Sequence, residues 1–332
     1  MMGVLNHLST LLLLSLLPPA LSHVVENFSV VPRCKEFFLE GTTPNLPGIL
    51  YDGIVQDQNR YKPICQLFKN MYRFATLYDT TNRIPVFSAY TFTGDGGKRP
   101  YQRWMIEPQL EDEMNVDNKN VKHQAANTDY LNNGLGLTRG HLFPCSYAPN
   151  DAAKRSTFTL TNAVPQYDTF NNGSWKTMEL NVMTTLMENC KNNNQIKAYV
   201  VTGAVPSNIK LKNRVNIPDL LWTAYCCYNN NLGQWMAGAH WGENQNEGQT
   251  LSKTLAKLNN MLNERYDVSG VKVFPDQCSN GELLFKCRKG YRGGIQVFPD
   301  KRRKGYRGGV QVFPDKRRKG YRGGVQVFPD KR

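Results

Sequence analysis

The order of apolar segments between residues 74 and 266 constrains the fold more than any other feature of the sequence. Short apolar runs typical of strands lie at 74–94, 156–162, 198–206 and 220–228, and runs with helical spacing lie at 174–190 and 251–266. Strands and helices are interspersed without a regular strand–helix–strand rhythm. This order predicts a mixed α+β domain and disfavours a doubly wound parallel sheet.

Several boundaries matter because they place polar residues. Segment 74–94 is interpreted as two strands around a turn at 79–82, and residues 95–135, rich in Gly, Asn, Asp and Lys, as a long surface excursion. The strand at 156–162 is expected to end at Asn162. The helix that follows is expected to start at a side-chain cap from Asn172 or Ser174.

The first 22 residues differ from this domain in composition. Their short apolar run ends in the small residues Ala20 and Ser22, which predicts a secretory signal peptide that is cleaved before His23. Two prolines interrupt the run, which is shorter than the roughly 20 residues of a membrane span. We therefore expect a secreted, extracellular protein without stable membrane association, whose domain covers residues 23–288.

Eight cysteines behind such a leader indicate disulfides, because an even count is typical of chains that fold in an oxidising compartment. The pairing stays open, because eight cysteines allow many connectivities. Cys226 and Cys227 are adjacent, so in a strand they would point to opposite faces and find different partners. No spacing typical of a zinc site occurs in the sequence.

Residues 289–332 are tandem copies of a unit that begins KGYRGG, two of 15 residues and a third of 14. They hold fourteen Lys and Arg against three Asp, which accounts for +11 of the net charge of +14 and leaves the remaining chain nearly balanced. Because these repeats bury little apolar surface, we expect disorder. Three interpretations stay open: an arm that binds polyanions, a recent duplication or gene-model error with no selected role, and a source of peptides released at dibasic sites.

One of the five histidines stands in an unusual setting. His141 follows Arg139 and Gly140 in the sequence TRGHLFP. Strand geometry would place Arg139 and His141 on one face, and Gly140 would let a backbone or a phosphate approach between them. Histidine exchanges protons near neutral pH, so this position is a candidate site. His123 and His240 lack such a setting.

A second segment, TNAVPQYDTFNNGSWKTMEL, supplies Asn162, Asn171 and Glu179 around the predicted helix. With Asn171 at the helix start, Glu179 would lie about 12 Å along the axis, so the two would not both be direct ligands of one ion. Asn171 with water in the remaining positions suits Mg²⁺, which prefers oxygen ligands and keeps several waters. The nearby helix N-terminus favours a phosphate.

Together the two segments resemble the DNA/RNA non-specific endonucleases, which carry a DRGH motif followed by an N…PQ…N…W…E pattern. AYVVTGAVP at 198–206 and IPDLLWTAYCC at 217–227 look like later blocks of the same family. The likeness covers roughly residues 60–265 and is strongest to the secreted endonuclease domain-containing 1-like branch. It implies a ββα-metal, or His-Me finger, nuclease fold with a central, mostly antiparallel sheet flanked by helices.

The resemblance also implies a secreted, Mg²⁺-dependent nuclease, with Mn²⁺ as the alternative cation, that hydrolyses single- or double-stranded DNA and RNA. His141 would be the general base that activates water, and Arg139 would stabilise charge on the phosphate. Asn171 would hold the metal ion, Glu179 would order the water bound to that ion, and Asn162 would orient the site.

One residue departs from the family's motif, since Thr138 stands where the family has Asp. A threonine could keep one hydrogen bond but not the charge, so reduced activity is expected. The alternative is a catalytically weak or inactive secreted protein that binds nucleic acid or another polyanion with the nuclease fold retained. A further arginine of the family contacts phosphate upstream, and the candidates are Arg83, Arg99 and Arg103.

Two asparagines fit the N-glycosylation pattern, Asn27 and Asn172. A glycan on Asn172 would crowd the metal expected at the neighbouring residue. We therefore expect only Asn27 to be used.

Overall fold

The computed structural model describes residues 23–112, 121–279, 295–300 and 307–312. The chain divides into two compact units, residues 1–283 and residues 284–332. The predicted signal peptide at 1–22 lies outside the described residues. Among the described helices, none is long and apolar enough to cross a membrane.

An eight-stranded sheet forms the centre of the first unit, and all of its pairings are antiparallel. The strands follow in the order β1 (His23–Val24), β4 (Tyr61–Phe68), β5 (Met71–Asp79), β6 (Ile84–Phe92), β11 (Ala198–Val205), β14 (Leu220–Asn229), β15 (Gln234–Glu243) and β16 (Leu251–Lys253). The predicted hairpin over 74–94 and the strands at 198–206 and 220–228 are confirmed, as is the α+β class with a central antiparallel sheet.

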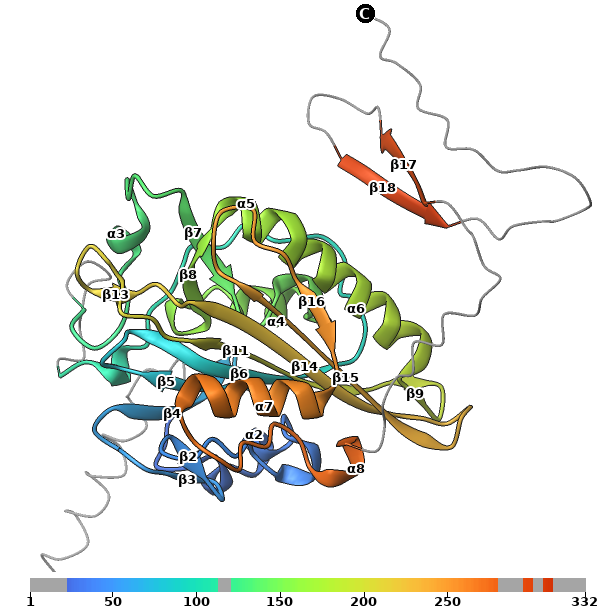
Figure 1. Ribbon diagram of the computed structural model, residues 1–332, viewed down its shortest axis with the longest axis horizontal. Coiled ribbons are helices and arrows are strands. Elements are labelled where there is room, and N and C mark those ends of the chain that lie inside the picture. Colours follow the sequence, from blue (N-terminus) through green and yellow to red (C-terminus); the bar gives the residue numbers. More distant parts are fainter. Residues whose placement is uncertain (1–22, 113–120, 280–294, 301–306, 313–332) are drawn as a thin grey trace, which may run out of the picture. The chain divides into compact units, whose positions relative to one another are not determined.

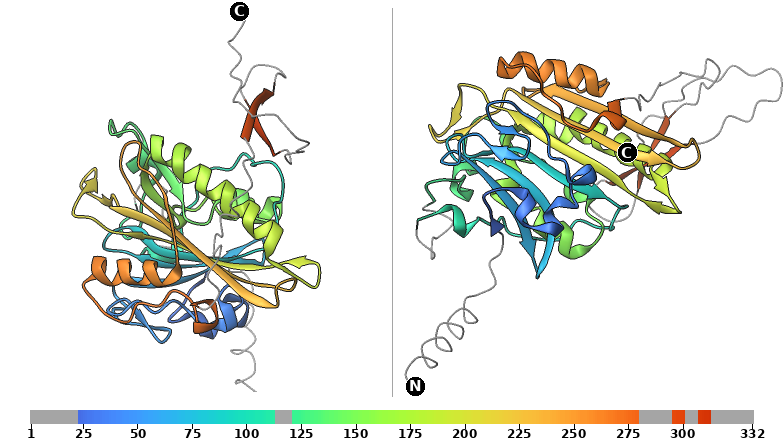
Figure 2. Two further views of the ribbon diagram at one scale, coloured as in Figure 1. Left: turned by 45° about the vertical axis from the view of Figure 1, so that its right-hand side comes forward. Right: turned by 90° about the horizontal axis from the view of Figure 1, so that it is seen from below.

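Each face of this sheet buries its own core, because side chains alternate along every strand. In β14, Trp222 and Cys226 belong to one core, and Tyr225 and Cys227 belong to the other. The first core is covered by α2 (Pro32–Lys35), α7 (Leu255–Tyr266) and α8 (Asp276–Ser279), and the second by α4 (Asp151–Ser156) and α6 (Lys176–Asn189). Figures 1 and 2 show α7 and α6 on opposite sides of the sheet.

A two-stranded antiparallel ribbon, β7 (Leu137–His141) with β8 (Ala163–Tyr167), contributes to the core on the α6 side. Three helical segments follow it, α5 (Asp168–Phe170), the π-helical turn η6 (Asn171–Trp175) and α6, with a kink at Gly173, whose backbone angles are not helical. Ribbon and helix together form the predicted ββα unit. The segment around His141 and the segment from Asn162 to Glu179 therefore lie together on the α6 side of the sheet.

Short elements make the remaining connections. They are η1 (Phe28–Val30), η2 (Leu39–Gly41), β2 (Leu50–Tyr51), β3 (Ile54–Val55), η3 (Pro108–Leu110), α3 (Asn127–Tyr130), η4 (Cys145–Tyr147), η5 (Leu160–Asn162), β9 (Lys191–Asn192), β10 (Gln195–Ile196), β12 (Lys210–Leu211) and β13 (Val215–Asn216).

The strand predicted at 156–162 is wrong. The segment begins at the end of α4, makes one parallel bridge between Thr159 and Met105, and turns through η5 at 160–162. Its alternation has another cause, since Thr159 and Thr161 both place their hydroxyls near the buried Glu107 carboxylate, which accepts from Thr159 Oγ1 at 2.9 Å. The alternating threonines therefore reflect long-range hydrogen bonds to Glu107, not the alternation of a strand.

Two further boundaries differ from the prediction. Neither Asn172 nor Ser174 caps α6, because the helical segments already start at Asp168 and the two side chains bond elsewhere, Asn172 to Asp168 and Ser174 to the Gly248 carbonyl. The helix predicted over 251–266 begins at Leu255, capped by Thr254 Oγ1, and is preceded by strand β16. In each case another element, α5 or β16, occupies residues near the predicted start of the helix.

The excursion predicted at 95–135 is also only partly a surface segment. Residues 113–120 lie outside the described residues, but Glu107, Gln124 and Tyr130 are buried. The backbone of Met105 bonds to Phe158 and Leu160 and so ties this segment to the ββα unit. The part of the segment that holds these buried residues therefore packs into the domain, and α3 contacts β7.

Three disulfides staple the first unit: Cys34–Cys65, Cys190–Cys227 and Cys226–Cys278. The prediction that the two adjacent cysteines have different partners is confirmed. Cys145 is a buried free thiol, and Cys287 lies outside the described residues. Two of these disulfides join β14 to elements on its opposite faces, and the third joins α2 to β4.

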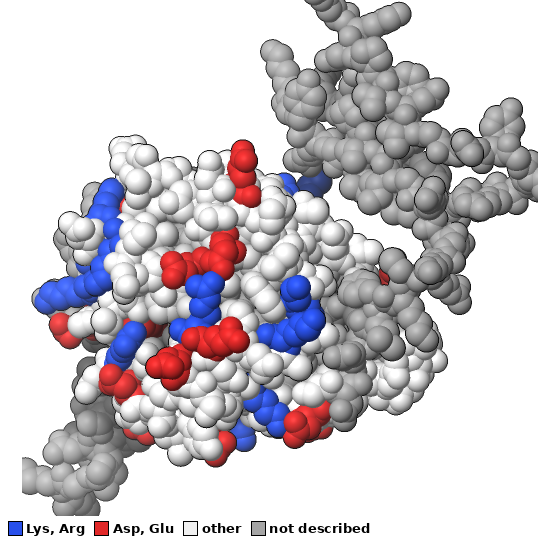
Figure 3. Space-filling model, viewed as in Figure 1, with Lys and Arg blue, Asp and Glu red and all other residues white. Residues whose placement is uncertain are grey.

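The second unit contains one antiparallel pair, β17 (Ile295–Asp300) with β18 (Arg307–Val312). Where disorder was expected throughout the repeats, these twelve residues are therefore described as strands. The other residues of the repeats lie outside the described part of the chain. Within the first unit, the face in Figure 3 shows Lys and Arg interspersed with Asp and Glu, in line with its nearly balanced charge.

Candidate functional site

His141 ends β7 in an aromatic surrounding. Its ring lies 4.7 Å from the Trp104 ring and 5.0 Å from the Phe158 ring, measured between centroids. The side chain is partly buried, and Nε2 has no hydrogen-bond partner among the described residues. Burial, followed by the charge of Arg99, lowers the pKa of His141 to about 3. The imidazole is therefore neutral at neutral pH, which is the form that accepts a proton.

Arg139 shares a face of β7 with His141, since both lie against Trp104. The guanidinium carbon is 5.8 Å from the Trp104 ring centroid and 4.9 Å from that of Tyr130. Its Nη2 donates to the carbonyl and the side-chain oxygen of Asn127 at 3.0 and 2.6 Å, while the buried Nε has no partner among the described residues. The prediction that these two residues point the same way is confirmed, and only the Nη2 donors of Arg139 are shown to be used inside the protein.

Gly140, between them, has a role other than the one expected. A Cβ at Gly140 would overlap Oε1 of Gln166, whose side chain lies against this backbone. The expectation that a backbone or a phosphate approaches here is wrong, because Gln166 fills the space. Neither polar atom of the fully buried Gln166 amide has a partner among the described residues.

Asn171 is joined to β7 by a hydrogen bond to Thr138. Its Nδ2 donates to Thr138 Oγ1 at 3.1 Å, and that hydroxyl donates in turn to the Gln166 carbonyl at 3.3 Å. Thr138 thus makes a hydrogen bond to Asn171 without contributing a charge. This bond also fixes the side-chain amide of Asn171, and its oxygen, Oδ1, is the atom that could bind a cation.

The residues near Asn171 fit a hard cation that keeps most of its water. An amide oxygen is a ligand that Mg²⁺ accepts, and the ion is often held by only one or two protein groups. In the described part of the chain, no cluster of three or more His, Cys, Asp or Glu is arranged to hold a metal. A cation at Asn171 would therefore depend on this amide oxygen, on water and on the substrate.

Glu179 lies two helical turns beyond Asn171 and is partly buried. Its Oε1 accepts a hydrogen bond from Trp175 Nε1 at 3.0 Å. Burial raises the pKa of Glu179 to about 8, against the opposing effects of the Trp175 bond and of the charges of Arg99 and Lys176. Without a further cation, this carboxyl is mostly protonated at neutral pH.

Asn162 is fully buried beneath the site. Its Oδ1 accepts from Ser88 Oγ at 2.8 Å and from the Phe143 amide at 2.9 Å, and its Nδ2 donates to the carbonyls of Phe143 and Thr157. All of its hydrogen-bonding capacity is used inside the protein. Asn162 therefore holds the segment after His141 and the segment before Phe158, and it leaves no amide atom for a substrate.

The structure distinguishes the three upstream arginines. Arg83 donates to the carbonyls of Lys122 and Arg214, so it serves a loop connection. Arg99 is exposed, and its guanidinium carbon lies 4.7 Å from the centroid of Phe158, the ring that also contacts His141. No hydrogen bond, ion pair or ring contact of the described residues joins Arg103 to the site.

Sequence reasoning missed Trp104, Phe158 and Gln166. Trp104 was placed in a surface segment and Phe158 in a strand, and neither position carries a local signal for a contact with His141. Gln166 belongs to the PQ motif of β8. In the ribbon it lies opposite Thr138 and diagonal to Gly140. The motif was therefore the one feature of the sequence that could have indicated Gln166.

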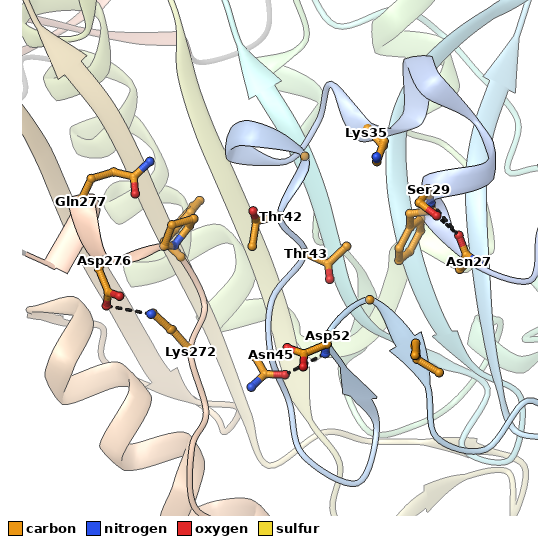
Figure 4. Close-up of a pocket in the computed structure, with 16 residues that line it drawn as sticks. Asn27, Ser29, Lys35, Thr42, Thr43, Asn45, Asp52, Lys272, Asp276 and Gln277 are labelled. Carbon is orange, nitrogen blue, oxygen red and sulfur yellow. Dashed lines mark hydrogen bonds and ion pairs between the residues drawn. The ribbon is translucent and has the colours of Figure 1, made fainter.

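Two cavities lie away from these residues. One of about 760 Å³ opens on the α7 side of the sheet, where Lys35, Asp52 and Lys272 line it (Figure 4). The other, of about 470 Å³, lies between α6 and β15 and includes His240, whose pKa burial lowers to about 4. Neither cavity contains any predicted site residue, so His240 stays outside the candidate site.

Comparison with known proteins supports the interpretation of the motif. A model of the family described as DNA/RNA non-specific endonuclease matches residues 55–275. The Endonuclease domain-containing 1 proteins of Homo sapiens and Mus musculus are 33% and 36% identical over 208 and 211 residues. Each match covers 59% of this chain, but only 39% and 38% of the relative. The chain thus matches about two fifths of the length of these relatives.

A solved structure is similar at a lower level. The EndoG chain from an EndoG/EndoGI complex, whose title concerns the mechanism of EndoG inhibition, has 19% identity and a TM-score of 0.43. The match covers 59% of this chain and 83% of that one.

Proposed function

The chain belongs to the DNA/RNA non-specific endonuclease family, and we propose from this premise that it hydrolyses phosphodiester bonds of DNA and RNA. The observation that carries the proposal is that a neutral histidine and two arginines surround the rings of Trp104 and Phe158, while a fixed asparagine amide bonds to Thr138 of the same strand as the histidine. His141, Arg139 and Arg99 are connected through the rings of Trp104 and Phe158, and Asn171 through Thr138. We assign this activity to a domain at residues 23–288.

His141 is the proposed general base. Its neutral ring takes a proton from the attacking water, and the aromatic rings beside it hold its orientation. A pKa near 3 makes a weak base, but it describes the site without substrate. A phosphodiester brings negative charge to the ring and raises the pKa of His141 toward the neutral range.

Arg139 and Arg99 are the proposed phosphate-binding residues. Both guanidinium groups lie beside rings that contact His141, so a phosphate bound by either one is brought to the base. Arginine suits this task because its planar fork of donors matches phosphate oxygens.

Asn171 is the proposed metal-binding residue. Its side-chain oxygen would hold Mg²⁺, or Mn²⁺ in its place, and such an ion supplies charge stabilisation at the scissile phosphate. Glu179 is proposed to order water at the site through Oε2, since Trp175 occupies Oε1. Asn162 is a positioning residue that shapes the backbone on either side of the base.

Secretion remains part of the proposal. Three disulfides support an oxidising compartment. Asn27, the glycosylation position that we favour, lies at the N-terminal end of the domain, on the sheet side away from His141. Asn172 lies next to the proposed metal-binding residue and bonds to Asp168.

A catalytically weak binding protein is the second candidate function, and Thr138 is the observation that favours it. The threonine contributes no charge next to Asn171. A cation would therefore be held by fewer charges than the family's motif provides.

Nicking of supercoiled plasmid and cleavage of RNA by the purified protein, with Mg²⁺ and with EDTA, test the proposal. His141→Ala should lower the rate by about 10²-fold or more, the usual contribution of a general base. Asn171→Ala should raise the Mg²⁺ concentration needed for half the maximal rate. Asn172→Ala, a change of the exposed neighbour, is the matched control and should not. Equal rates for His141→Ala and the unaltered protein would remove His141 from the mechanism.

A further inference from the structure

The loop that carries Arg99 is fastened to α4 on both sides of that arginine. Consecutive residues of α4, Lys154 and Arg155, bond to Asp95 and Tyr101 of the loop. We propose that Lys154 and Arg155 are positioning residues that hold Arg99 against the site. This inference rests on the proposed function, because it concerns the arginine that would bind the substrate's phosphate.

The first anchor is a buried ammonium group. Lys154 is 1% exposed, and its Nζ donates to Asp95 Oδ1 at 3.2 Å and to the Cys145 carbonyl at 3.2 Å. Cys145 stands four residues after His141. One ammonium group therefore connects the loop before Arg99, helix α4 and the segment that follows the proposed base.

Close backbone packing supports the same anchor. The Gly96 amide donates to the Ala148 carbonyl at 3.2 Å, and a Cβ at Gly96 would overlap the backbone of Pro149. The Asp95 carboxylate also accepts from the Gly97 amide at 2.9 Å. The loop therefore packs closely against the residues just before α4, and a side chain at Gly96 would move the loop away from these residues.

The second anchor lies beyond Arg99. Arg155 Nη1 donates to the Tyr101 carbonyl at 2.7 Å, while its Nε donates to Asp151 at 2.7 Å, which fixes the guanidinium. Arg99 is therefore held between anchors at Asp95 and Tyr101. Its own side chain stays exposed, with its guanidinium carbon 4.7 Å from the Phe158 ring centroid.

Stability alone gives a poor reason for burying Lys154. A buried ammonium group loses its hydration, and its partner Asp95 is 43% exposed, so solvent weakens the attraction between the two charges. An apolar side chain would fill the space under the loop, but it could not fix the loop's direction. A charged hydrogen-bond donor with two acceptors on different segments does fix it, which is the best-supported use of a buried charge.

Kinetics in two backgrounds separate positioning from general stability. On a short DNA duplex with Mg²⁺, Arg99→Ala should lower kcat/KM by about 10²-fold, as the loss of one charge-stabilising donor does. Lys154→Met should lower it by about 10-fold, because a small displacement of a positioned group is costly. In the Arg99→Ala background, Lys154→Met should have an effect of about 2-fold or less, since two changes that act through one group are not additive.

Limited digestion with trypsin supplies a readout that needs no activity. Release of the loop should increase cleavage after Lys98 by about 10-fold in Lys154→Met, because local opening governs cleavage. The conservative variant Asp95→Glu should stay near the unaltered protein. Lys272→Met, which removes an ion pair with Asp276 on the other side of the sheet, is the control and should leave cleavage after Lys98 unchanged.

The outcomes are distinguishable. Additive losses in the two backgrounds, or unchanged cleavage after Lys98, would overturn the positioning role. If Lys154→Met does not fold, Arg155→Met removes the second anchor and carries the same test. If the unaltered protein cleaves neither DNA nor RNA, the proposed function fails, and digestion after Lys98 still decides whether the two anchors hold the loop.

Discussion

Replacing Thr138 by aspartate should strengthen cation binding at Asn171. The threonine hydroxyl accepts from Asn171 Nδ2 at 3.1 Å, so a carboxylate in its place can accept the same bond and keep the amide oriented. A cation held by the amide oxygen would lie about 5 Å from that carboxylate, where a divalent and a univalent charge attract by about 1.5 kcal/mol in a water-like dielectric. Thr138→Asp should therefore lower the Mg²⁺ concentration for half the maximal rate by about 10-fold.

The assay is the initial rate of duplex cleavage over a Mg²⁺ titration at low ionic strength, because salt screens this attraction. Thr138→Asn is the matched control, since it has the shape of aspartate without the charge. It should need Mg²⁺ within about 2-fold of the unaltered protein, given that only the Coulomb term distinguishes the two variants. If Thr138→Asp needs as much Mg²⁺ as Thr138→Asn, the cation does not bind near Asn171, and the metal-binding role fails.

Three further changes have expected outcomes. Gly140→Ala should destabilise the protein by about 1–3 kcal/mol in urea unfolding through overlap with Gln166, and Gln166→Ala in the same chain should recover much of this loss. The raised pKa of Glu179, about 8, means that the folded protein binds an extra proton from about pH 4.5 to 8. Its contribution to stability therefore falls as pH rises through that window, by up to about 1.4 kcal/mol per pH unit, and Glu179→Gln should remove this slope from unfolding measured at several pH values. Deleting 289–332 should leave the rate on saturating short substrate unchanged and flatten log affinity against log salt by about 3–4 units, whereas an unchanged slope would show that the repeats do not touch nucleic acid.

The sequence predicted those parts of the fold that depend on local periodicity. The hairpin of β5 and β6, strands β11 and β14 and most of α6 follow from apolar spacing, and strand alternation placed Arg139 beside His141. Boundaries failed where polar side chains serve another purpose. The threonines at 159 and 161 bond to Glu107, and the asparagines at 171 and 172 lie within helical segments that already start at Asp168.

The surroundings of His141 could not be derived in this way. Trp104 and Phe158 reach the histidine only after the segment around Met105 has packed along the ββα unit, and such contacts leave no periodic trace. The choice of Arg99 among the three arginines has the same origin. The position of Arg99 depends on the bonds that α4 makes to its loop, and the composition of the loop does not reveal these bonds.

Substrate and cation should act on the protonation of this site in opposite directions. Without them, His141 is neutral with a pKa near 3, and Glu179 is protonated with a pKa near 8. A bound phosphate opposes the effect of Arg99 on His141 and raises that pKa, which makes the ring a stronger base. Positive charge brought near Glu179 lowers its pKa and releases its proton. A bound phosphate therefore makes His141 a stronger base, and a bound cation favours the ionised form of Glu179, so each ligand is expected to adjust one of the two residues for catalysis.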